Sequence, residues 1–102
     1  MSVIHKFVLP VRGHVSIEMP RGAQVLKCDM QRGNLCLWAI VDPSLELVHR
    51  YFRVVGTGHA FDDLDAGSFV GTVQETFAGG ELVFHVFEAR PPLELFPGAS
   101  AT

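Results

Sequence analysis

The chain has 102 residues and a net charge of −3, from eleven acidic and eight basic residues. Hydrophobic residues make up 48% of it and charged residues only 19%, so it can bury a core of its own, and an intrinsically disordered protein is excluded. The acidic balance argues against a nucleic-acid partner, because nucleic-acid binding needs a basic surface.

The beginning of the chain and its longest apolar run indicate where the protein acts. Residues 1–6 lack the apolar core of a signal peptide. The longest apolar run, residues 35–41, is far shorter than the roughly 18 residues of a membrane-spanning helix. We therefore expect a cytoplasmic protein with no membrane partner. Two cysteines, Cys28 and Cys36, are too few for a disulfide scaffold, and their spacing matches no zinc-binding motif. We therefore expect both cysteines to pack as small apolar residues in or near the core.

Turn-forming residues recur about every ten residues, and short runs rich in Val, Ile, Leu and Phe lie between them. No long window repeats apolar side chains at helical spacing. The sequence therefore predicts an all-β fold, a compact antiparallel sandwich or small barrel of about seven short strands. The expected strands are residues 3–9, 14–19, 23–31, 34–42, 46–55, 68–74 and 81–89.

Residues 23–31 and 34–42 predict a hairpin, for which two loop lengths are open. A two-residue loop at Arg32 and Gly33 pairs Cys28 with Leu37. A three-residue loop, residues 31–33, places Cys28 directly opposite Cys36. We expect the three-residue loop, because Gly33 then occupies the position that needs a positive φ.

Two of the expected strands, residues 34–42 and 81–89, are apolar on both faces. The first is predicted to be a central strand covered on both sides, and the second to be central or at a subunit contact. In residues 46–55, Arg50 shares a face with Phe52, whereas Arg53 lies on the opposite face. The two arginines therefore form no ready-made clamp.

The chain divides into a single β domain, residues 1–90, and a proline-rich C-terminal tail, residues 91–102. Leu93, Leu95 and Phe96 in this tail are too apolar for a free end, so we expect them to dock on the domain or on a neighbouring copy. Together with the strands that are apolar on both faces, they predict a homo-oligomer.

The candidate ligand-binding residues are Gly56, Thr57, Gly58 and His59, which follow a strand directly. A glycine turn of this kind can present backbone N–H groups to a phosphate, with Thr57 or His59 completing the site. Arg53, beside Tyr51, adds a cation. The motif lacks the third glycine of a dinucleotide-binding fingerprint and the lysine of a P-loop, so a plain tight turn is the alternative.

No catalytic residue, metal ligand or cofactor is expected. Asp62, Asp63 and Asp65 follow His59 but lack the order of a calcium-binding loop. The five histidines form no metal-binding pair, and His85, between Val83 and Phe87, is expected to be a hydrogen-bonded histidine of the core or of an interface. The serines lack a nucleophile motif, which argues against an enzyme.

Four segments carry a resemblance to a known family: Leu-Trp-Ala-Ile-Val-Asp-Pro at residues 37–43, Phe-Arg-Val-Val-Gly-Thr-Gly-His at 52–59, Phe-Val-Gly-Thr-Val-Gln at 69–74 and Leu-Val-Phe-His-Val-Phe-Glu at 82–88. Over residues 3–89 the chain is similar to a family of small uncharacterised all-β proteins common in tailed-phage and prophage genomes. The resemblance implies a phage accessory protein that acts in the cytoplasm of a host bacterium.

Our hypothesis for the function is a non-enzymatic binding protein that sequesters or inhibits a host component in counter-defence. Its partner would be a host protein or a small nucleotide ligand. The alternatives are a structural or assembly protein of the virion, and a small phosphate-handling enzyme that uses His59.

Overall fold

The computed structural model describes residues 1–62 and 67–91, which form seven β-strands and no helix. None of the described residues forms a helix that could cross a membrane. The predicted tail from residue 92 onward, and Asp63 and Asp65, lie outside the described residues. The strands are β1 (Val3–Leu9), β2 (His14–Pro20), β3 (Gln24–Gln31), β4 (Asn34–Val41), β5 (Leu47–Gly56), β6 (Ser68–Phe77) and β7 (Gly80–Ala89).

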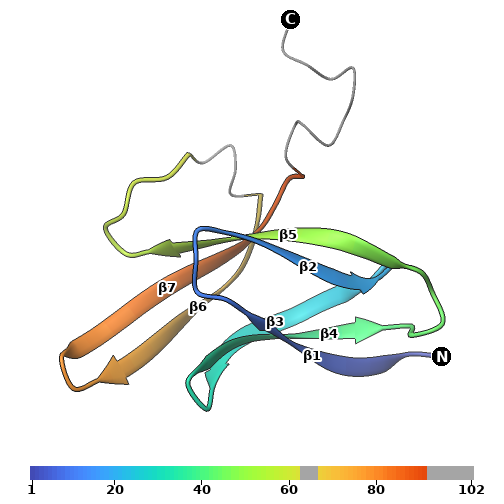
Figure 1. Cartoon of the computed structure of the whole chain (residues 1–102), viewed down its shortest axis with the longest axis horizontal. Helices are drawn as coiled ribbons and strands as arrows, with labels where there is room; N and C mark the ends of the chain where they lie inside the picture. Colours follow the sequence, from blue (N-terminus) through green and yellow to red (C-terminus); the bar gives the residue numbers. More distant parts are fainter. Residues whose placement is uncertain (63–66, 92–102) are drawn as a thin grey trace, which may run out of the picture.

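The strands form two antiparallel sheets, which we call sheet A and sheet B (Figure 1). Sheet A has the order β1-β4-β3 and sheet B the order β2-β5-β7-β6. Two separate sheets around a shared core make a sandwich, not a barrel. The predicted all-β class and antiparallel sandwich are therefore confirmed. As predicted, β4 and β7 both have a neighbour on each side.

The core lies between the two sheets and follows the alternation of side chains along each strand. Sheet A contributes Leu35, Leu37, Ala39 and Val41 from β4, all buried. The facing side of sheet B contributes buried residues from all four of its strands: Val15, Met19, Phe52, Val54, Val73 and Val86.

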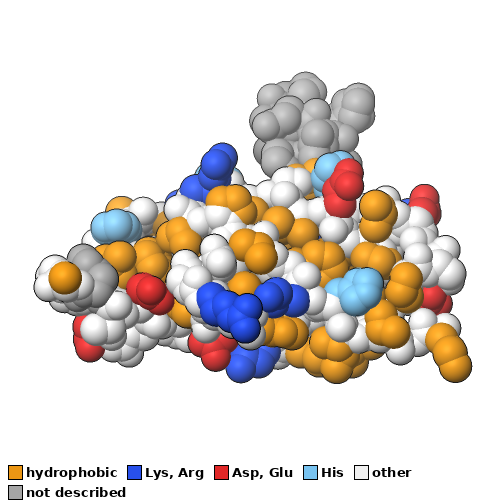
Figure 2. Space-filling view, turned by 60° about the horizontal axis from the view of Figure 1, so that its bottom comes forward, with side chains coloured by type: hydrophobic (Ala, Val, Ile, Leu, Met, Phe, Trp, Pro, Cys, Tyr) orange, Lys and Arg blue, Asp and Glu red, His pale blue; other side chains and the backbone are white. Residues whose placement is uncertain are grey.

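The outer face of β4 is less covered than the sequence predicted. Cys36 is buried there, but Trp38 and Ile40 are only half-buried. Their neighbours on β1, Ile4 and Val8, are 59% and 52% exposed. Figure 2 brings forward the side of the molecule on which β1 lies, with hydrophobic side chains spread over it and Lys and Arg side chains among them. Sheet A therefore keeps a partly apolar outer surface.

The hairpin between β3 and β4 has the two-residue loop, so the expected three-residue loop is wrong. Gln31 pairs with Asn34 and Cys28 with Leu37, and both loop residues have positive φ, 51° at Arg32 and 79° at Gly33, as in a type I′ turn. Moving β3 by one residue would turn its charged side chains, Lys27 and Asp29, toward the core and expose the residues now buried. Burial therefore decides the register.

Both cysteines are free and buried, as expected from the sequence. Because of the register they lie on opposite faces of sheet A. Burial, together with the negative charge of Asp29, raises the pKa of Cys28. Its Sγ faces Gly71 on β6: a Cβ added to Gly71 would lie 2.9 Å from this sulfur. Sheets A and B therefore approach closely where β3 faces β6.

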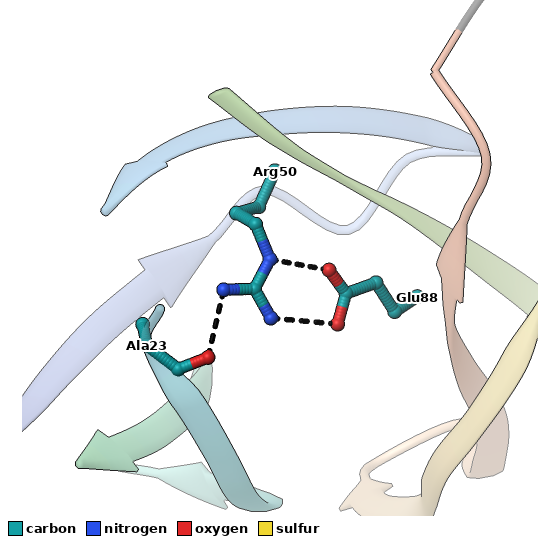
Figure 3. A network of polar contacts seen from close by, with 3 residues as sticks. All are labelled: Ala23, Arg50 and Glu88. Carbon is teal, nitrogen blue, oxygen red and sulfur yellow. Dashed lines mark hydrogen bonds and ion pairs between the residues drawn. The ribbon is translucent and has the colours of Figure 1, made fainter. Parts of the chain in front are cut away.

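Arg50 and Glu88 form an ion pair on the core side of sheet B, near one end of the sandwich (Figure 3). The guanidinium binds the carboxylate through two hydrogen bonds, from Nε and from Nη2, the latter 2.9 Å long. Nη1 donates to the carbonyl oxygen of Ala23, at 2.8 Å, at the start of sheet A. These hydrogen bonds with Glu88 raise the pKa of Arg50. One side chain thus links β5 and β7 of sheet B to Ala23, the residue directly before β3 of sheet A.

We expect Glu88→Leu to lower the free energy of unfolding by about 1–3 kcal/mol, because it leaves Arg50 unpaired. The loss should be smaller than at a fully buried site, since the two side chains are 20% and 28% exposed. The double variant Arg50→Met/Glu88→Leu should regain most of the loss. Urea denaturation measures the free energy of unfolding of the wild-type protein, the single variant and the double variant.

Arg21→Gln, which breaks the exposed pair with Glu46, is the control and should cost less than about 1 kcal/mol. An equal cost for Glu88→Leu would contradict the role of the inter-sheet pair.

Arg32→Asn should raise the free energy of unfolding by about 0.5–1 kcal/mol, because asparagine tolerates the positive φ of this position better than arginine. Arg32→Ala removes the same charge but keeps the unfavourable backbone, so it should give no gain. Thermal unfolding of the two variants measures the difference. Equal stability of Arg32→Asn and Arg32→Ala would show that the backbone at residue 32 is not strained.

Candidate functional site

A cleft of about 300 Å³ lies at the edge of sheet B, where β5 continues beyond the start of β2. Next to the cleft, the N–H of Val54 on β5 donates to the carbonyl oxygen of Gly13, directly before β2, at 3.1 Å. Alternate residues of a strand direct their N–H groups to the same side, so the N–H of Gly56 faces the cleft. Its polar lining comes from Arg12, Gly13, Arg53, Gly56 and His59, and its apolar lining includes Val11 and Phe84.

Arg53 extends from the outer face of β5 toward the connection between β1 and β2. A Cβ added to Gly13 would lie 2.5 Å from Nη1 of Arg53, so the guanidinium rests directly against the backbone of this glycine. Nε of Arg53 is buried and has no hydrogen-bond partner; among the described residues it is the one buried side-chain nitrogen or oxygen in this state. A buried N–H without a partner costs free energy.

The predicted glycine turn is present and places His59 in the cleft. His59 N–H donates to the carbonyl oxygen of Gly56, at 3.1 Å, and Gly58 has φ of +86°, which glycine adopts most easily. The imidazole lies over Gly56: an added Cβ there would be 2.9 Å from Nδ1 of His59. A glycine at position 56 therefore makes room for the ring.

The structure brings three of the five predicted ligand-binding residues to the cleft: Arg53, Gly56 and His59. Gly58 shapes the turn without lining the cleft, and Thr57 points to the outer face of sheet B. The sequence analysis missed Arg12 and Gly13. The sequence predicts a turn at these residues, between two strands. It does not predict that this turn lies beside the end of β5, because that depends on the order of the strands in sheet B.

Thr57 belongs to a second polar group on the outer face of sheet B. Its Oγ1 lies 2.8 Å from Nε2 of His85, and Oγ1 of Thr72 lies 2.9 Å from Nδ1 of the same ring. Both ring nitrogens thus have hydroxyl partners. The predicted hydrogen-bonded histidine is confirmed, but it lies on the outer face and half-buried, not in the core.

An aromatic group lies next to this histidine. Phe87 on β7 pairs with Arg53 on one side and with Phe69 on the other. Its ring centroid is 5.5 Å from that of Phe69, at 63°, and 6.0 Å from that of Phe61, at 31°. Phe69 is 62% exposed and Phe61 41%. We call Phe61, Phe69 and Phe87 the aromatic group.

The chain belongs to a family described as a domain of unknown function, DUF7352, whose model matches residues 1–95. No curated protein and no solved structure matches the chain. Membership of an uncharacterised family, as the resemblance implied, is thereby confirmed. The association with phages stays a prediction.

Proposed function

We propose that this protein is a non-enzymatic binding protein that captures a small phosphate-bearing ligand in the cleft between the β1–β2 connection and the end of β5. With the phage origin that the sequence resemblance implies, capture of such a ligand in the host cytoplasm would serve counter-defence, by removing a signal that the bacterium makes.

The observation that carries the proposal is Arg53, whose buried Nε–H lacks an acceptor and whose guanidinium reaches the cleft. A phosphate oxygen is the acceptor that suits a guanidinium best, because the two groups match in charge and in the geometry of their hydrogen bonds. An incoming anion would complete the hydrogen bonding of a cation that the fold already holds in place.

The rest of the cleft favours the same kind of ligand. Arg12 provides a second cation, and the N–H of Gly56 faces the same space. Gly13 and Gly56 leave room for the guanidinium of Arg53 and the ring of His59 to lie against the backbone. Since the whole chain carries a net charge of −3, overall charge would repel an anion, so binding depends on this local arrangement. The expected product of the interaction is a complex, without turnover of the ligand.

A second candidate function is a structural or assembly role in the phage particle. It is favoured by the outer face of sheet A, where Ile4 and Val8 are largely exposed beside the half-buried Trp38 and Ile40. We call these four residues the sheet A patch. Lys6 lies on the same face and on the edge strand β1, where a lysine opposes direct edge-to-edge pairing. A second copy of the chain that packed face to face on the patch would cover the apolar stem of Lys6, whose amino group donates to Gln31.

Calorimetric titration with pyrophosphate tests the cleft. The wild-type protein should bind it, and Arg53→Gln should weaken binding at least tenfold, because a charge-assisted hydrogen bond contributes about 1.5–3 kcal/mol. Gly13→Ala, which keeps every charge but displaces the guanidinium, should also weaken it. Arg21→Gln, a loss of the same charge at an exposed ion pair, should change the affinity less than twofold. Equal affinities for Arg53→Gln and wild type would contradict the proposal.

Light scattering after size-exclusion chromatography tests the sheet A patch. At micromolar concentration we expect a dimer or larger homo-oligomer, and we expect Ile4→Glu to dissociate it, because the new charges would be buried in the interface. Leu47→Glu, at an equally exposed position of another strand, should leave the assembly intact. A wild-type monomer would overturn self-association.

A further inference from the structure

We propose that the aromatic group is a stacking platform for a nucleobase, and that the ligand of the neighbouring cleft is consequently a nucleotide. This inference rests on the proposed capture of a phosphate-bearing ligand by Arg53 and adds the part of the ligand that the cleft itself does not hold.

The register of sheet B places the cation and the aromatic rings in one row. Arg53 on β5, Phe87 on β7 and Phe69 on β6 are direct cross-strand partners. Arg53 and its partner share the outer face, since Val54 and Val86 of the next pair face the core. Neighbouring strands are about 5 Å apart. The backbone of Phe87 is therefore about 5 Å from that of Arg53, and the backbone of Phe69 is about 10 Å from it. The guanidinium turns the other way, toward Gly13. A ligand with its phosphate in the cleft would therefore extend its remaining part across Arg53 onto the rings.

Two of the three rings are open to an incoming flat group. Phe87 is half-buried and contacts both other rings, whereas Phe61 and Phe69 are 41% and 62% exposed. Exposed aromatic rings next to cations are the usual surface on which proteins stack bases, and such stacking contributes about 1–3 kcal/mol per base. The same loop carries His59 into the cleft and Phe61 onto Phe87, so it joins the two halves of the proposed site.

The next row of the sheet offers polar groups at the edge of this platform. His85 directly pairs with Thr72 and lies two residues before Phe87 on β7. The hydroxyls of Thr57 and Thr72 hold its ring from both sides and are themselves at the surface. Hydroxyls can both donate and accept hydrogen bonds, which suits the edge of a stacked base. A partner with only apolar side chains would form no hydrogen bond with these hydroxyls.

Titration with adenosine 5′-monophosphate and with ribose 5-phosphate separates the base from the phosphate. The wild-type protein should bind the nucleotide at least fivefold more tightly, because only the nucleotide stacks. Phe69→Leu and Phe61→Leu should each reduce this ratio at least twofold and leave the affinity for ribose 5-phosphate unchanged. Leu47→Ala, a truncation of an equally exposed apolar residue, should change neither affinity.

The outcomes distinguish the two proposals. Equal affinity of the wild-type protein for the two ligands, with Arg53→Gln weakening both, would overturn the platform and leave the phosphate cleft standing. A preference for the nucleotide that survives both phenylalanine substitutions would also overturn it. If neither ligand binds, the phosphate cleft and the platform are overturned together.

Discussion

The bidentate pair between Arg50 and Glu88 is the constraint on which the arrangement of this sandwich depends. It lies on the core side of sheet B and reaches the backbone of Ala23, directly before β3 of sheet A. An arginine held in this position fixes which way every residue of β5 points, because side chains alternate along a strand. Phe52 and Val54 must then face the core, and Arg53 must face outward. The cation of the candidate site is thus directed by an ion pair three residues away that takes no part in binding.

A shift of β5 by one residue would therefore be doubly unfavourable. It would turn the charged Arg53 toward the core and expose Phe52, one of the largest fully buried side chains. The same logic acts in the β3–β4 hairpin, where the alternative register would turn Lys27 and Asp29 inward. In both places the register is selected by the cost of burying a charge, more than by the preference of a turn.

These two cases explain how far the sequence alone could lead. The strands, their faces and the opposite orientation of Arg50 and Arg53 follow from local alternation, and all were predictable. The hairpin loop was predicted wrongly because Gly33 fits both loop types. The prediction used the preference of glycine for positive φ and left out the cost of turning the charged residues of β3 toward the core. The partner of Arg50 and the approach of Gly13 to Arg53 could not be predicted, since both depend on which strands are neighbours in space.

The contact between Cys28 and Gly71 has a consequence for how the sequence of this domain can change. With a Cβ on residue 71 placed 2.9 Å from the sulfur, the space between β3 and β6 holds one side chain and not two. Positions 28 and 71 therefore share a fixed volume: a side chain at position 71 requires a residue smaller than cysteine at position 28. In a diverging lineage the two positions should change as a compensating pair, although 42 residues lie between them along the chain.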